Sequence, residues 1–365
     1  MTEKAIQTDI ASKTTNPEQN AVAEPFWKKT LKFCLKFGIS AAILIYLIHS
    51  RHITLKDFAN VRIDYVILAF FCIVLQVFLT SIRWRSLLKA VGIHCTVWEA
   101  FSLQMQGAFF SLCIPGGSVG GDIIKAGLLV SRTPKDGKFN CVFSIFVDRL
   151  CGLSALLLTL LLTCLVCREE IELFEPAERH SLSVMCMICG CVFLLTVLVF
   201  FSDLLYKIPL TRFFLNLADK ITKNTFRKAA DAVGIYRHSW YLPVIWILAA
   251  TFIFFPILGV PVWLIANGIQ GAPERSLLPC LMTSNISQTI AAIPISFGGT
   301  GMRDIACTKM LEALSIGKPD SVVIPLLITL LSIFSSLTGA VFFIFSHKKK
   351  SVKPSNNEQR SDTKK

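Results

Sequence analysis

The sequence alternates long apolar runs with short polar and basic segments. The apolar runs cover residues 33–49, 64–82, 98–114, 140–167, 182–202, 241–267, 277–296 and 321–346. A membrane-spanning helix needs about 20 predominantly apolar residues, whereas the strands of a membrane barrel alternate over pieces of about ten residues. The pattern therefore predicts an all-α polytopic membrane protein with about eight apolar helical segments.

Composition and charge refine this picture. The chain is 53% hydrophobic and 17% charged, unlike an average soluble domain. Its net charge of +13 comes mostly from loops and tails, which indicates membrane orientation and anionic lipid rather than nucleic acid. We expect residues 1–25 and 347–365 to be disordered cytoplasmic tails and residues 26–346 to form the transmembrane domain. Lysines interleaved with apolar residues in 203–240 predict an amphipathic cytoplasmic helix.

The distribution of Lys and Arg predicts the orientation of the chain. Segment 203–240 carries seven basic residues and the tail after 346 carries seven, against two in 168–181 and one in 268–276. Both termini are therefore expected in the cytoplasm. Following the spans, residues 98–130 begin and end inside, whereas 277–317 begin and end outside. Each of these two segments must enter the membrane and return.

The two returning segments share one sequence pattern of glycines followed by an aspartate. "IPGGSVGGDIIKAGLL" (114–129) and "SFGGTGMRDIACTKML" (296–311) share a GGxxxxDI pattern. Inverted repeats with broken helices build midplane sites in many transporters. The pattern predicts two re-entrant elements in inverted pseudo-symmetric halves. The candidate binding residues are Gly116, Gly117, Gly120, Gly121 and Asp122 in the first and Gly298, Gly299, Gly301, Arg303 and Asp304 in the second.

Two interpretations of these glycine-rich turns remain open. Irregular backbone at membrane depth is tolerated where it is enclosed or lines a watery cavity, and a following helix N-terminus favours an anion such as a lipid phosphate. Alternatively, the turns are interfacial loops in which Asp122 and Asp304 cap helices and Arg303 reaches the headgroups.

Further ionisable residues lie within or beside apolar runs. Asp148 and Arg149 interrupt "CVFSIFVDRLCGLSALLLTLLL", and such residues are by default functional candidates with partners. Because adjacent helix positions face different ways, we expect each to pair elsewhere, with Asp122, Lys125, Arg303 or Asp304. The alternative is that both are wetted near the cytoplasmic end. Arg83 is either an interfacial anchor beside Trp84 or a headgroup contact.

The cysteines and the known catalytic motifs indicate whether the sequence predicts a metal site or a catalytic site. Two CxxC pairs, Cys164 with Cys167 and Cys186 with Cys189, have the spacing of a zinc ribbon but lie in or beside apolar runs. Cysteine is an ordinary small apolar residue there, so no metal site is predicted. The sequence contains no Walker, HExxH, GxSxG or dinucleotide motif. No catalytic residue or cofactor is predicted, and any transport is expected to be passive or coupled to an ion gradient.

Four motifs in order resemble the lysylphosphatidylglycerol synthase transmembrane (flippase-like) family. They are Arg83 with Trp84, "PGGSVGGD" (115–122), "DRLCGL" (148–153) and "PISFGGTGMRD" (294–304), and the resemblance covers about residues 30–346. It implies a polytopic fold with two re-entrant elements, a module that moves an aminoacylated phospholipid between leaflets in relatives, and a separate soluble domain that synthesises that lipid. We expect this chain to carry the membrane module without the synthase.

This sequence departs from the family pattern at two positions. We consider three hypotheses for its function. Asp304 stands where the family often has Glu, and Lys125 where it often has Arg, so the lipid can differ. The leading hypothesis is a protein of a bacterial inner membrane that binds or translocates an anionic or aminoacylated phospholipid, with no nucleic-acid partner. The second is an intramembrane transferase with Asp122 or Asp148 as base. The third is a non-transporting partner of a lipid-modifying enzyme.

Overall fold

The computed structural model describes residues 58–113, 118–133, 138–172, 174–200, 241–292 and 300–348. Within these residues the fold is helical apart from one isolated β-bridge. The first half contains α4 (Ile63–Ala90), α5 (Val97–Cys113), α6 (Ser118–Val130), α7 (Lys138–Val166), α8 (Arg168–Glu172) and α9 (Pro176–Phe200). The second contains α13 (Tyr241–Ala249), the π-helix η4 (Ala250–Phe254), α14 (Phe255–Gly268), α15 (Leu277–Ala291), α16 (Thr300–Ala313) and α17 (Asp320–Lys348).

Five helical stretches of the described chain are long and apolar enough to cross a membrane. They are α4, α7, most of α9, the continuous α13–η4–α14 stretch and most of α17. Two predicted apolar runs became the shorter helices α5 and α15, of 17 and 15 residues. At about 1.5 Å per residue neither reaches across a hydrocarbon core of about 30 Å. The predicted all-α polytopic fold is confirmed, while the run 33–49, the segment 203–240 and both tails lie outside the described residues.

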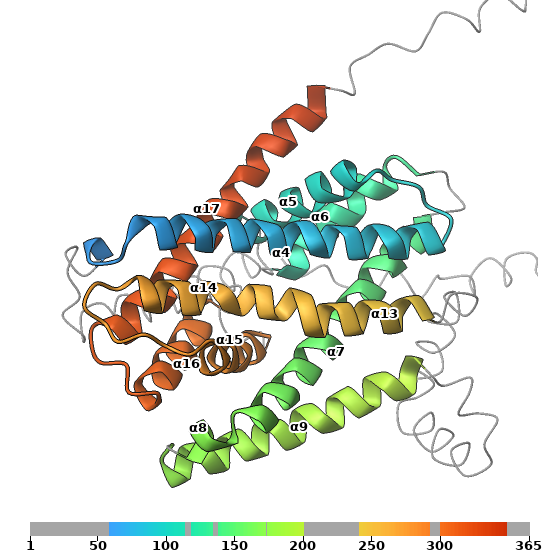
Figure 1. Cartoon of the computed structure of the whole chain (residues 1–365). Helices are drawn as coiled ribbons and strands as arrows, with labels where there is room; N and C mark the ends of the chain where they lie inside the picture. The colour runs from blue at the N-terminus through green and yellow to red at the C-terminus, as the bar shows by residue number, and fades with distance from the viewer. Residues whose placement is uncertain are drawn as a thin grey trace, which may run out of the picture.

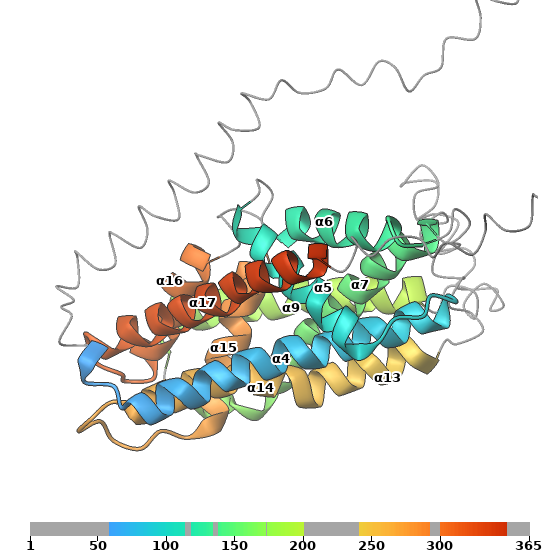
Figure 2. The same ribbon diagram turned by 90° about the horizontal axis from the view of Figure 1, so that it is seen from above.

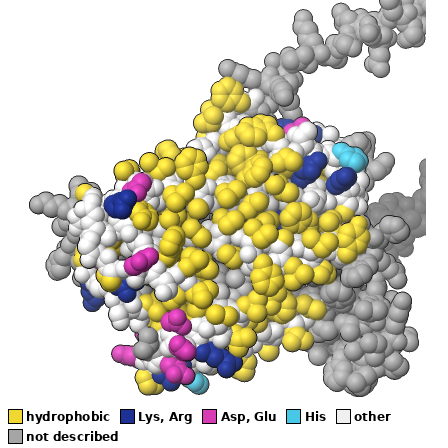
Figure 3. Space-filling model, viewed as in Figure 1, with side chains coloured by type: hydrophobic (Ala, Val, Ile, Leu, Met, Phe, Trp, Pro, Cys, Tyr) yellow, Lys and Arg dark blue, Asp and Glu magenta, His cyan; other side chains and the backbone are white. Residues whose placement is uncertain are grey.

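The outer surface of the bundle is apolar. Figure 3 shows hydrophobic side chains across the face formed by α4 and α13–α14, with charged side chains towards its margins. Exposed residues on this and other faces include Phe71 of α4, Met187 of α9 and Phe334 of α17. Such an exposed apolar surface suits contact with lipid chains rather than water.

The two halves repeat one arrangement. A long helix, a hairpin of two short helices and a second long helix follow one another as α4, α5–α6 and α7, and again as α13–α14, α15–α16 and α17 (Figure 1). α4 lies antiparallel beside α14 (Figures 1 and 2), and Val61 pairs with Ile269 at one end of this contact. α5 packs against α17, and α15 packs against α7. These exchanged contacts are those of a pseudo-two-fold axis.

Two apolar clusters show that the hairpins start from opposite ends of α4. One contains Trp84, Leu103, Leu129 and Ile145, and joins the end of α4 to the start of α5, the end of α6 and the start of α7. The other cluster contains Val61, Ile265, Cys280, Leu311 and Ile324. It joins the start of α4 to the end of α14, the start of α15, the end of α16 and the start of α17. The inverted arrangement is therefore confirmed, while the assignment of these ends to cytoplasm and exterior stays a prediction.

Glycines make the loops and the hairpin contacts possible. The loop that leads into each hairpin contains a glycine with positive φ, Gly92 at 79° and Gly271 at 80°, where a side chain would be strained. Inside the first hairpin, a Cβ on Gly121 would collide with the Ser111 hydroxyl and the Gly107 carbonyl. A Cβ on Gly339 of α17 would likewise collide with the Met105 carbonyl of α5. Small residues thus let these helices approach closely.

Candidate functional site

Arg83 and Asp148 join α4 to α7 through an enclosed ion pair. Arg83 Nε donates to Asp148 Oδ1 at 2.8 Å, and the two side chains are 8% and 7% exposed. The neighbouring Trp84 is completely buried and its indole nitrogen donates to Ser144 Oγ at 3.3 Å. The interpretation of Arg83 and Trp84 as interfacial anchors is therefore wrong, because the α5–α6 hairpin and α7 enclose this end of α4.

A second set of contacts surrounds Asp122 of α6. Arg149 Nε of α7 donates to Asp122 Oδ2 at 2.6 Å, and Lys125 Nζ lies 3.8 Å from Asp122 Oδ1. The buried Lys125 also donates to Gln104 Oε1 at 2.9 Å and lies 4.1 Å from the ring centre of Trp84. A carboxylate, an amide oxygen and an aromatic face all stabilise an ammonium group.

The consecutive residues Asp148 and Arg149 thus pair with different helices, as the helical geometry predicted. Arg149 pairs with Asp122, one of the expected partners. The partner of Asp148 is Arg83, 65 positions earlier in the chain, and this pairing was missed. No periodic signal connects α4 with α7, so the pairing follows from packing alone.

These groups line a cavity of about 640 Å³ between the two hairpins. Ser118 at the start of α6 and Ala292 just after α15 both border it, as do residues from the middle of α4 and α17. Its polar wall carries the five ionisable residues together with Gln76, Thr80, Gln104, Ser111, Ser118, Thr329, Ser332 and Ser336. Among the described residues, the α5–α6 hairpin thus supplies much of the lining, whereas the second hairpin contributes only Ala292.

The arginines of the cavity keep hydrogen-bonding capacity. Arg83 and Arg149 use Nε for their carboxylates, and within the described residues their terminal nitrogens have no protein acceptor. A Cβ on Gly152 would lie 3.3 Å from Arg83 Nη2, so the glycine of "DRLCGL" leaves room for this guanidinium. Each carboxylate holds an arginine in place while two N–H-bearing nitrogens stay available to a ligand.

An apolar wall completes the cavity. It is formed by Leu153 and Leu156 of α7 and by Phe254 and Phe255, where η4 passes into α14. A π-helical turn carries an extra residue per turn and is frequent at functional sites. The cavity thus combines a charged wall with an aromatic and aliphatic one.

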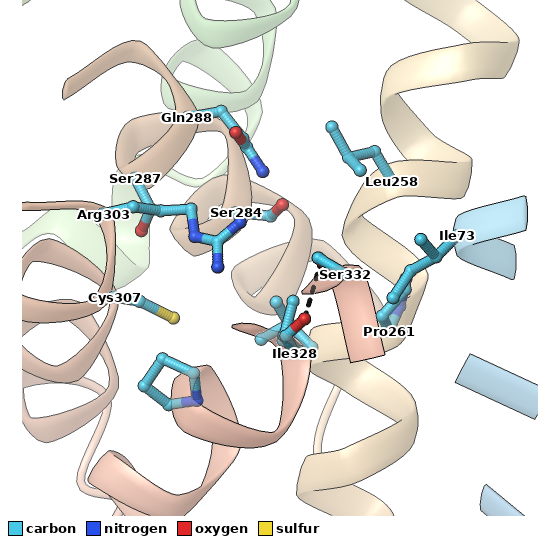
Figure 4. Close-up of a pocket in the computed structure, with 12 residues that line it drawn as sticks. Ile73, Leu258, Pro261, Ser284, Ser287, Gln288, Arg303, Cys307, Ile328 and Ser332 are labelled. Carbon is cyan, nitrogen blue, oxygen red and sulfur yellow. Dashed lines mark hydrogen bonds between the residues drawn. The ribbon is translucent and has the colours of Figure 1, made fainter. Parts of the chain in front are cut away.

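The second motif forms a separate, smaller cluster. Asp304 is completely buried; Arg303 Nε lies 3.2 Å from its Oδ1, and Thr329 of α17 donates to Oδ2 at 2.7 Å. Arg303 Nη2 also donates to Thr329 Oγ1. Figure 4 shows the Arg303 guanidinium extending into a pocket of about 30 Å³ beside Ser284, Ser287 and Cys307, which is room for about one water. The Arg303 side chain is 14% exposed and is therefore largely enclosed.

The two motif aspartates occupy matching positions. Asp122 is the fifth residue of α6 and Asp304 is the fifth residue of α16, and each bonds to the following long helix through Arg149 or Thr329. The helix-cap interpretation is wrong for both, because each aspartate lies beyond the first turn. Gly120, Gly121 and Gly301 lie inside these helices. Gly116, Gly117, Gly298 and Gly299 lie outside the described residues.

The paired cysteines lie away from the cavity. Cys167 and Cys189 are buried, with Cys164 and Cys186 partly buried beside them, in an apolar cluster that joins α7, α9 and α15. In the part of the chain that the structure describes, no three His, Cys, Asp or Glu residues form a group that could hold a metal ion. Their position suits apolar packing between helices.

Comparisons with known proteins agree with this architecture. The family model described as "Lysylphosphatidylglycerol synthase TM region" matches residues 33–339. A UPF0104 membrane protein of Pyrococcus horikoshii is 21% identical over 81% of this chain and 91% of its own length. A UPF0104 membrane protein of Methanocaldococcus jannaschii is 29% identical over 32% of this chain and 34% of its own. No solved structure matches. The chain therefore belongs to the lysylphosphatidylglycerol synthase transmembrane-region family, which supports a role related to membrane lipids.

Proposed function

We propose that this protein binds the phosphate of a membrane lipid in the cavity between its hairpins and moves the lipid between leaflets. The observation that carries the proposal is the pair of arginines, Arg83 and Arg149, whose terminal nitrogens have no acceptor among the described residues at the cavity wall. A planar guanidinium with two available donors matches the oxygens of a phosphate.

Pre-organisation supports this role. Asp148 and Asp122 hold the two guanidinium groups by their Nε atoms, so little side-chain freedom is lost when an anion binds. A fixed donor arrangement contributes more to binding than a flexible one, because the ordering has already taken place.

The shape of the cavity favours a lipid over a soluble phosphate compound. Its charged wall faces an apolar wall that contains Leu153, Leu156, Phe254 and Phe255. A lipid presents a polar headgroup beside apolar chains, so both walls find a matching part of the same molecule. The inverted hairpins are also the type of scaffold that transporters use around a midplane site.

The ion pairs argue against the transferase hypothesis. Asp122 and Asp148 each accept a hydrogen bond from an arginine, so both carboxylates are already engaged in the protein rather than free to contact a substrate hydroxyl. The observed geometry therefore favours binding and movement over proton abstraction.

A reconstitution experiment tests the proposal. Purified protein is placed in liposomes that carry a fluorescent phospholipid, and the rate at which the lipid changes leaflet is measured. Arg149→Gln is expected to lower this rate about tenfold, since one charge-assisted bond to phosphate contributes roughly 1.5–3 kcal/mol. Arg62→Gln is the matched control, because Arg62 is exposed at the opposite end of α4 and pairs with Asp64.

The outcomes separate the three hypotheses. Undiminished movement in Arg149→Gln would exclude the proposed role of the cavity. A new lipid product after addition of a headgroup donor would indicate the transferase. Neither movement nor a product would indicate a non-transporting partner.

A further inference from the structure

The charge balance of the cavity identifies the type of lipid that fits it. Among the residues that the structure describes, three cations line the cavity, Arg83, Lys125 and Arg149, against two carboxylates, Asp122 and Asp148. The other described side chains that line it are neutral. One positive charge is therefore left over, and a ligand with one negative charge balances it.

The carboxylates are already matched with cations. Asp122 contacts both Arg149 and Lys125, and Asp148 contacts Arg83. The ammonium group of an aminoacylated headgroup would bring a further positive charge beside these three cations. Like charges in a partly enclosed site repel more strongly than in water, so a cationic headgroup is disfavoured.

The hydroxyl groups of the cavity wall indicate what else the headgroup carries. Thr80, Ser111, Ser332 and Ser336 each donate their hydroxyl proton to a backbone carbonyl of their own helix. A hydroxyl whose proton is used in this way offers oxygen lone pairs to a ligand. The wall therefore accepts hydrogen bonds from donors, and uncharged hydroxyl groups supply donors without adding charge.

We infer that the cavity selects a phospholipid with one net negative charge and an uncharged, hydroxyl-bearing headgroup, such as a glycerol or another polyol. The inference rests on the proposed function and names its substrate class. The lipid named here differs from an aminoacylated phospholipid, which the resemblance implies, because it lacks the added ammonium group.

Competition among matched lipids tests the inference. Wild-type protein in detergent is offered phosphatidylglycerol, lysylphosphatidylglycerol, phosphatidylethanolamine and phosphatidylmethanol with identical acyl chains, and bound lipid is quantified by native mass spectrometry. Phosphatidylglycerol is expected to bind about tenfold more tightly than the lysylated and ethanolamine lipids. It is expected to exceed phosphatidylmethanol, which has the same charge and no headgroup hydroxyl, by about threefold.

Two substitutions assign the selectivity to the cavity. Lys125→Gln removes the excess charge and is expected to reduce the preference for phosphatidylglycerol over phosphatidylethanolamine about tenfold. Lys89→Gln removes the same charge from an exposed position of α4 and is expected to preserve the preference. Ser336→Ala keeps the charge balance and serves if Lys125→Gln does not fold. It removes one of the four hydroxyl acceptors and is expected to reduce the difference between phosphatidylglycerol and phosphatidylmethanol.

The possible results distinguish failure of the inference from failure of the proposed function on which it rests. Equal or tighter binding of lysylphosphatidylglycerol would overturn the inference and leave the lipid-binding role standing. An unchanged preference in both Lys125→Gln and Ser336→Ala would place the selectivity elsewhere. Failure of every lipid to bind would overturn the proposed function together with the inference.

Discussion

Arg83 and Asp148 show what enclosure does to a single charged pair. Both side chains are more than nine-tenths buried, and they connect helices that lie far apart in the sequence. In such surroundings the attraction between the charges offsets a large cost of removing them from water. The loss of one partner is therefore more damaging than the loss of both.

Asp148→Asn is expected to destabilise the protein by ~3–5 kcal/mol, because Arg83 then remains as an uncompensated buried charge. The midpoint of thermal unfolding in detergent or nanodiscs measures this effect. The double substitution Arg83→Met with Asp148→Leu is expected to recover most of the midpoint, since it leaves no unpaired charge.

Arg62 and Asp64 supply the comparison at the surface. They form an ion pair of 2.7 Å with side chains 54% and 57% exposed, and exposed pairs contribute little to stability. Asp64→Asn is expected to leave the midpoint unchanged. An equal loss in both single variants would show that Asp148 is not enclosed in the protein.

Short helices and glycines decide the geometry at the scale of the elements. α6 and α16 each follow a glycine-rich stretch of the sequence and present an aspartate as their fifth residue. The first hairpin closes around Gly107 and Gly121, where the backbones of α5 and α6 meet. This contact holds Asp122 and Lys125 against α7 and α4.

Gly121→Ala is expected to destabilise the protein by about 1–3 kcal/mol, because the new methyl group forces α5 and α6 apart. Lipid movement is expected to fall as Asp122 loses its position. Gly127→Ala, in the same helix, is the matched control, since its Cβ would meet nothing within 4 Å. It is expected to raise stability by about 0.5–1 kcal/mol through helix propensity, and a similar loss in both variants would contradict the proposed contact.

The whole molecule combines symmetric architecture with asymmetric chemistry. Both halves contain the same order of long helix, hairpin and long helix. Among the described residues, the first half supplies all five charged residues of the large cavity, while Arg303 and Asp304 of the second half bond to Thr329 and do not line it. The pseudo-two-fold axis therefore builds the frame, and the side chains of one half make the site.

The loops that lead into the two hairpins are expected to lie on opposite sides of the membrane. Single cysteines in place of the exposed His94, in the α4–α5 loop, and Glu274, in the α14–α15 loop, are expected to react with an impermeant thiol reagent from opposite sides. The loop basic residues predict that position 94 is cytoplasmic. A cysteine-free parent gives the background, and labelling of both positions from one side would refute the inverted topology.

The sequence by itself determined the fold class, the two hairpins and the five ionisable residues of the cavity. Apolar length and charge distribution act locally or through the membrane, so spans and orientation can be counted along the chain. The shared GGxxxxDI pattern likewise places Asp122 and Asp304 at the same position, the fifth residue, of their helices.

The tertiary structure decided which charges meet. It paired Arg83 with Asp148, enclosed Lys125 beneath Trp84 and removed Arg303 from the large cavity. Such pairings depend on how helices separated by tens of residues pack. No local pattern records that information, because the energy of a buried ion pair arises from its three-dimensional surroundings.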